Sequence, residues 1–249
     1  MEYWEYLLIF AAGYAAGTIN TLAGGGGILA MPTLIFLGLP SVVANGTYRL
    51  AVIATGMFGV AGFRSKGITT WPYSLYLGGV AFAGALIGAE LAKVLDDTWF
   101  NRVLAIVMVG IVALMVFRPV KPAAEIVEQM AQKHKILAYI AFFFIGIYGG
   151  FIQVGVGLII LATLTSIHGW SIVKSNSAKL MVVMIYTLGA LGVFIYDGLI
   201  RWDLGLIMAA GNAGGAWVTS RWSVNKGDRR IRILLLIVAI VLAGKLFFF

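Results

Sequence analysis

The stretch Gly17-Thr18-Ile19-Asn20-Thr21-Leu22-Ala23-Gly24-Gly25-Gly26-Gly27-Ile28-Leu29-Ala30-Met31-Pro32 lies in an apolar part of the chain, where a helix would otherwise continue. Each glycine costs about 1 kcal/mol relative to alanine inside a helix, so four in a row predict that the helix ends here. A broken helix is tolerated in a bilayer only where protein or a polar cavity shelters the freed backbone groups. We therefore expect a buried cavity at the break, with Asn20 and Thr21 on one side and a short helix beginning near Gly27 on the other.

The backbone amides of this new helix are candidate ligands for an anion. The N-terminus of a helix carries a partial positive charge, and glycines in front of it let an anion approach the amides of Gly25, Gly26 and Gly27 closely. The alternative is that the glycines only allow membrane helices to pack closely. The neighbouring Asn20 and Thr21 favour a broken-helix binding site.

The composition identifies an integral membrane protein. Of the 249 residues, 61% are hydrophobic and 11% are charged, whereas soluble domains carry roughly 25% charged residues. The chain has no cysteine and only two histidines, which excludes disulfides and cysteine- or histidine-rich metal sites, so no cofactor is expected. The net charge of +8 comes from basic residues in short loops between apolar spans, a pattern of membrane topology and not of nucleic-acid binding.

Two similar halves make up the predicted architecture. Spans of about 20 apolar residues are predicted at 4–22, 43–63, 71–92 and 100–117 and again at 136–153, 172–196, 202–222 and 231–249, with short segments at 27–39 and 157–167. At a shift of about 130 residues, Arg49 matches Lys179 and Trp71 matches Trp202. We predict a first repeat at 1–118, a cytoplasmic connector at 119–135 with an amphipathic stretch at 123–132, and a second repeat at 136–249.

The basic residues decide between parallel and inverted repeats, because cytoplasmic loops are enriched in Lys and Arg. If each broken segment turns back, the repeats are inverted and one side collects Arg64, Lys66, Arg118, Lys121, Lys133, Lys135, Lys174, Arg221, Lys226, Arg229, Arg230 and Arg232. The other side then holds only Lys93, Arg102, Arg201 and Lys245. Continuous segments would abolish this bias. We therefore predict an all-α membrane protein of two inverted repeats, each with four to five membrane segments and a re-entrant helix at its glycine-rich motif, and with both termini outside.

Two basic residues, Arg49 and Lys179, fall inside apolar segments at equivalent positions of the two halves. A charge at membrane depth is costly unless it faces a cavity or a counter-charge. The sequence offers no carboxylate at similar depth, so a transported anion is the simplest counter-charge. The alternative is that both side chains extend to the membrane interface from near the start of their helices. Guanidinium and ammonium groups beside hydroxyl and amide donors suit a small oxyanion.

The chain resembles the sulfite exporter TauE/SafE family of membrane proteins. The resemblance lies in Gly17 to Gly27, Met31-Pro32 and Gly46-Thr47-Tyr48-Arg49-Leu50-Ala51, and in their counterparts Gly155-Val156-Gly157, Asn176-Ser177-Ala178-Lys179-Leu180 and Gly215-Ala216. It implies a bacterial or archaeal inner-membrane permease for sulfite, sulfonates or related organic anions. The chain departs from the family pattern at Tyr48-Arg49, where the family often has Asn-Lys, and at Ala162, which stands opposite Pro32.

We therefore expect a transporter that moves a small oxyanion by alternating access at the interface of two inverted repeats. The expected substrate-binding residues are Arg49, Lys179, Asn20, Thr21, Gly25, Gly26, Gly27, Asn45, Thr47, Gln153, Gly155, Gly157, Asn176 and Ser177. An anion channel with the same site and a membrane subunit without transport activity are the alternatives. An enzyme is not expected, because no nucleophile, metal cluster or carboxylate pair is found at membrane depth. The expected partners are the anion and the lipid bilayer, without nucleic acid; a homo-oligomer is compatible with the sequence.

Overall fold

The fold is all-helical, as predicted. The computed structural model describes residues 3–117 and 132–248, with side chains at 3–110 and 134–225. In these ranges the helices are α1 (Tyr3–Ala23), α2 (Gly27–Phe36), α3 (Ser41–Arg64), α4 (Tyr73–Val94), α5 (Asp97–Phe117), α6 (Gln132–Phe151), α7 (Val156–His168), α8 (Ile172–Tyr196) and α9 (Trp202–Phe248). Among the described residues, four helical stretches are long and apolar enough to cross a membrane: α1, α4, His134–Phe151 and α8.

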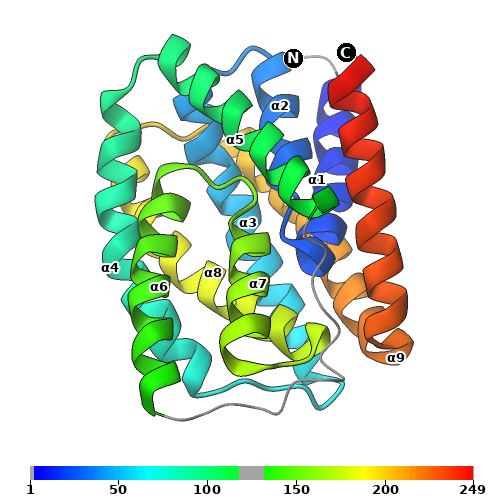
Figure 1. Ribbon diagram of the computed structural model, residues 1–249. Helices are drawn as coiled ribbons and strands as arrows, with labels where there is room; N and C mark the ends of the chain where they lie inside the picture. Colours follow the sequence, from blue (N-terminus) through cyan, green and yellow to red (C-terminus); the bar gives the residue numbers. More distant parts are fainter. Residues whose placement is uncertain (1–2, 118–131, 249) are drawn as a thin grey trace.

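Both predicted helix breaks are confirmed. In the first half α1 ends at Ala23 and α2 begins at Gly27, and in the second half α6 ends at Phe151 and α7 begins at Val156. The chain turns at Gly24 (φ 77°) and Gly155 (φ 72°), in the left-handed region that only glycine adopts without cost. Figure 1 shows α1 entering from the upper end of the molecule and α2 returning to it, while α6 enters from the lower end and α7 returns there.

The helices of the two predicted halves pack against one another in a reciprocal way. The first helix of the first half, α1, packs along α9, and the first helix of the second half, α6, packs along α4. Helix α3 packs on α9 and α8, and α8 packs on α4 and α3. This exchange supports the division into two inverted repeats, which stays a prediction.

Glycines allow these reciprocal contacts to be close. A Cβ at Gly84 or Gly88 of α4 would collide with backbone atoms of α6, and a Cβ at Gly211 or Gly215 of α9 would collide with backbone atoms of α1. Small residues at such positions let helix backbones approach where dispersion contacts hold membrane helices together. We call α1–α2 and α6–α7 the two turn-back pairs. Each is thereby fixed against a helix of the opposite half: α1 against α9, and α6 against α4.

The last two predicted segments share one helical element. The segments predicted separately at 202–222 and 231–249 belong to the single helical element α9. The polar stretch between them holds one glycine, no proline and several Lys and Arg residues, which are good helix formers, so it is part of the helical element although the chain reverses direction within α9. Figure 1 shows the orange first part of α9 running to the lower end and its red last part running back, so that α9 ends at the upper end, where α1 begins.

The predicted connector lies mostly outside the described residues. Helix α6 already begins at Gln132, so it includes the last four residues that were assigned to the connector at 119–135. Residues 118–131, with the predicted amphipathic stretch, are not described. The cytoplasmic position of the connector stays a prediction.

Candidate functional site

Arg49 lies on α3 and is fully buried. Its guanidinium donates hydrogen bonds to the carbonyl oxygen of Gly149 (3.2 Å), to that of Gly150, and at 3.5 Å to Oε1 of Gln153. Asn45, one turn earlier on the same face of α3, donates from Nδ2 to the carbonyl oxygen of Phe151 at 2.9 Å. Arg49 and Asn45 together bind the last turn of α6.

Lys179 has the equivalent role on α8 and is also fully buried. Its Nζ donates to the carbonyl oxygens of Asn20 (2.7 Å) and Thr21 (3.1 Å) and to Oδ1 of Asn176 (2.6 Å). Asn176 donates from Nδ2 to the carbonyl oxygen of Leu22 at 3.0 Å. Lys179 and Asn176 therefore bind the last turn of α1, the broken helix of the opposite half.

These contacts give Arg49 and Lys179 partners besides the transported anion expected from the sequence. The last four carbonyls of a helix have no partner within the helix, and that end carries a partial negative charge. The broken helices thus supply stabilising groups to Arg49 and Lys179 at membrane depth. The alternative that both side chains reach the membrane interface is wrong, because each has 0% exposure. Carbonyls carry no net charge, and no described carboxylate forms an ion pair with either cation.

The two turns, Gly24 to Gly27 between α1 and α2 and Ile152 to Gly157 between α6 and α7, are called the first and second tip. The two tips contact each other. A Cβ on Gly24 would collide with the backbone of Gly157, and a Cβ on Gly157 would collide with Gly24. A Cβ on Gly27 would also collide with the backbone of Gln153. The second tip therefore fills the place where the sequence predicted a cavity beside Asn20. Both interpretations of the glycines are needed: they break the helix, and they also allow close packing.

The tips carry backbone amides without a partner. Within the described residues, the amides of Gly25, Gly26 and Gly27 and of Gly155, Val156 and Gly157 donate to no acceptor; the first bonds of the new helices run from Ile28 to Gly25 (3.1 Å) and from Leu158 to Gly155 (3.0 Å). All six residues are buried. Because a buried unpaired amide is costly, these donors are suited to a ligand that accepts hydrogen bonds.

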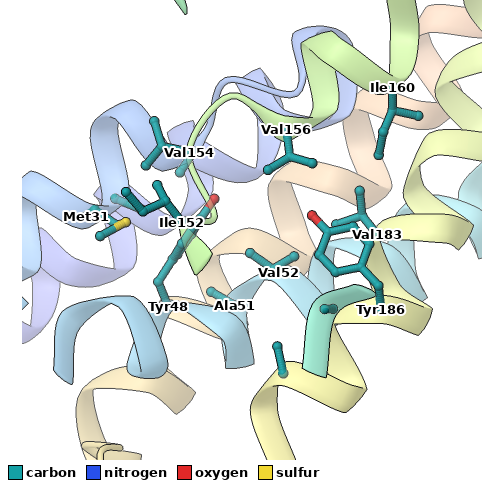
Figure 2. Close-up of a cluster of buried hydrophobic side chains, with 14 of the residues drawn as sticks. Met31, Tyr48, Ala51, Val52, Ile152, Val154, Val156, Ile160, Val183 and Tyr186 are labelled. Atoms are coloured by element: carbon teal, nitrogen blue, oxygen red, sulfur yellow. The ribbon is translucent and has the colours of Figure 1, made fainter. Parts of the chain in front are cut away.

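Sequence reasoning missed an aromatic shell around Arg49. Tyr186 on α8 accepts a hydrogen bond from Nε2 of Gln153 at 2.9 Å, and the ring centre of Phe194 lies 4.7 Å from the guanidinium carbon of Arg49. Figure 2 shows Tyr48 and Tyr186 with their rings directed toward the loop that carries Val154 and Val156. Tyr186 follows Lys179 by seven residues, which places both on one face of α8; that spacing was the available signal.

Three predicted site residues use their hydroxyl groups elsewhere or lie apart from the tips. Thr21 donates to the carbonyl oxygen of Gly17 within α1 (2.8 Å). Thr47 accepts a hydrogen bond from the backbone amide of Arg201 (3.0 Å), between α8 and α9. Ser177 lines a cavity of about 440 Å³ between α3, the α3–α4 loop and α8; the other lining residues are Val60, Arg64, Gly67, Ile68, Thr69, Thr70, Trp71 and Met181.

Comparisons with known proteins find relatives among membrane transporters. The family model described as sulfite exporter TauE/SafE matches residues 9–246. The chain is 28% identical to a probable membrane transporter protein, ORF9, of Sinorhizobium sp, over 96% of this chain and 90% of that protein. It is 26% identical to the probable membrane transporter protein YfcA of Escherichia coli strain K12, over 97% of this chain and 89% of that protein. It is 23% identical to a probable membrane transporter protein of Haemophilus influenzae, over 96% and 93%. No solved structure matches the chain at a significant level.

Proposed function

Because the chain belongs to the sulfite exporter TauE/SafE family, we propose that it transports a small oxyanion across the membrane, by alternating access between two inverted repeats. Sulfite, a sulfonate or a related organic oxyanion fits this proposal best. The family and its curated members support a membrane transporter. The chemistry at the two tips supports the anion.

The observation that carries the proposal is the set of donors around the tips. Six amides of buried residues have no acceptor among the described residues. They lie at the N-termini of α2 and α7, and helix N-termini attract negative charge. Nε of Arg49 is buried and has no partner in the described part of the chain. An oxyanion has several acceptor oxygens and one or two charges, so it satisfies these donors.

The charge balance supports an anion and not a cation. Arg49 and Lys179 bring two positive charges to the broken helix ends, where their protein partners are neutral carbonyl and amide oxygens. In a water-poor interior, such charges interact more strongly with a bound ion than they would at the surface. Binding a cation beside them would add repulsion. The tips touch at Gly24 and Gly157, so we expect a compact anion.

Stabilisation of the detergent-purified protein tests this function. A ligand that binds only the folded state stabilises it by about 2.7 kcal/mol at a concentration one hundred times its Kd. That corresponds to a rise of roughly 5–11 °C in unfolding temperature for a chain of this size. We expect such a rise with one or a few of sulfite, sulfate, thiosulfate, alkyl sulfonates and small carboxylates, and none with sodium or potassium chloride controls.

The decisive variants are Arg49→Gln and Lys179→Gln, which remove the charge and keep hydrogen-bonding capacity. Both also weaken the binding of a broken helix end, so the matched control is a variant that loses stability without losing charge. Asn212→Ala serves, because Asn212 donates from Nδ2 to Ala51 and Thr55 between α9 and α3. We expect the anion response to persist in Asn212→Ala and to be lost in both charge variants. A full response in both charge variants, or no response to any anion in folded wild-type protein, would refute the proposal.

A further inference from the structure

Thr47 and Ser177 occupy equivalent places in the two halves. They lie 130 residues apart, as Arg49 and Lys179 do. Each faces a loop of the opposite half: Thr47 of α3 faces the α8–α9 loop, and Ser177 of α8 faces the α3–α4 loop. The two loops match as well, because each turns at a glycine of positive φ (Gly67, 79°; Gly198, 66°).

The contact at Thr47 is closed. The backbone amide of Arg201 donates to Oγ1 of Thr47 at 3.0 Å. A Cβ on Gly46 would collide with the carbonyl oxygen of Leu199, so the α8–α9 loop lies directly on α3. At the same end of the molecule, Lys93 of α4 forms an ion pair with Asp197 at the end of α8. At the upper end in Figure 1, these contacts link α3 and α4 to the end of α8 and the loop that follows it.

The contact at Ser177 is open. A cavity of about 440 Å³ lies between Ser177 and the α3–α4 loop. By equivalence, the backbone amide of Thr70 corresponds to that of Arg201, but among the described residues it makes no hydrogen bond to Ser177. Arg64 lines the same cavity, and a cation beside a cleft raises the local concentration of anions.

The cavity and the proposed anion site are both bounded by the first turns of α8. Ser177 directly follows Asn176 in α8 and lies within one turn of Lys179. Asn176 and Lys179 bind the end of α1. The cavity therefore lies beside the turn of α8 whose Asn176 and Lys179 bind the end of α1. On the Thr47 side, the α8–α9 loop lies on α3 at Gly46 and Thr47, within one turn of Arg49.

We propose that the cavity at Ser177 is the open access path to the anion site and that the Thr47–Arg201 contact is the closed gate of the opposite path. In the alternate state the amide of Thr70 donates to Oγ of Ser177, while the amide of Arg201 leaves Thr47. This inference rests on the proposed transport function. It assigns the two loops, residues 67–71 and 197–201, as the elements that exchange.

Single-cysteine labelling tests this exchange cleanly because the chain has no cysteine. In the detergent-purified protein, we expect a hydrophilic maleimide to label Ser177→Cys at least about tenfold faster than Thr47→Cys. Thr69→Cys in the exposed α3–α4 loop reports the rate of an unhindered cysteine. Variants are compared only as monodisperse fractions after size exclusion. Equal labelling rates, or faster labelling of Thr47→Cys, would overturn the assignment of open and closed paths.

A second measurement asks whether the two paths are coupled. Lys93→Gln removes the ion pair with Asp197 and weakens the closed end. We expect about threefold faster labelling of Thr47→Cys and correspondingly slower labelling of Ser177→Cys, because destabilising one state raises the population of the other. Arg201→Gln is the matched control: it removes a cation at the same end, but its partner Asp203 is two residues away, and the backbone bond to Thr47 remains. Faster labelling at Thr47 without slower labelling at Ser177 would overturn the exchange.

These measurements need no anion. Failure of the anion to stabilise the protein would contradict the proposed function and leave the labelling result standing. Equal labelling of Ser177→Cys and Thr47→Cys, with a normal anion response, would contradict the exchange of the two loops and leave the proposed function standing. The two proposals therefore fail separately.

Discussion

The contact between the two tips makes a quantitative prediction for Gly24→Ala. Gly24 has φ 77°, and an alanine in the left-handed region costs about 1–2 kcal/mol. Its Cβ would also collide with the backbone of Gly157, and such overpacking costs about 1–3 kcal/mol more. Gly38 provides the matched control because it has φ 89° but nothing within 4 Å of an added Cβ. We expect losses of about 2–5 kcal/mol for Gly24→Ala and about 1–2 kcal/mol for Gly38→Ala.

The assay is the temperature at which half of the detergent-purified protein disappears from its monodisperse size-exclusion peak. The expected difference between the two variants, about 1–3 kcal/mol, corresponds to roughly 2–12 °C. Gly157→Ala, at a position without positive φ, should show the packing loss alone. Equal midpoints for Gly24→Ala and Gly38→Ala would refute the contact between the tips, because the backbone cost is common to both.

Two further variants test the groups around the broken helices. Asn45→Ala and Asn176→Ala each remove a hydrogen bond to a last-turn carbonyl, so each should lower the free energy of unfolding by about 1–3 kcal/mol, measured in the same heating assay; unchanged midpoints would contradict a role in binding the helix ends. Tyr186→Phe removes the oxygen that accepts from Gln153 and should cost about 1 kcal/mol, which a midpoint equal to that of the wild type would exclude.

The fold was largely predictable because its main features follow from local chemistry. The run of glycines from Gly24 to Gly27 ends a helix wherever it lies, and the pattern Gly155-Val156-Gly157 does the same in the second half. Apolar length gives the spans. The polar stretch 223–230 separates two predicted segments but belongs to α9, because polarity alone does not end a helix.

The partners of the buried cations were not predictable in the same way. Side-chain carboxylates can be read from a sequence as counter-charges, whereas free backbone carbonyls cannot. Which carbonyls are free depends on where α1 and α6 end, and which cation meets them depends on the packing of one half on the other. The spacing of Asn45 and Arg49, and of Asn176 and Lys179, was the only local sign that each pair shares a helix face.

The two halves are chemically unequal at these cations, and the inequality follows from counting donors. An ammonium group has three donors, and Lys179 uses them on Asn20, Thr21 and Asn176. A guanidinium group has five, and Arg49 retains an unpartnered Nε after binding the end of α6. A ligand can therefore gain a hydrogen bond from Arg49 without displacing any partner, whereas Lys179 must give up one of its three hydrogen bonds, two of which hold the end of α1. The arginine that distinguishes the first half from the second thus supplies the donor that the fold itself does not use.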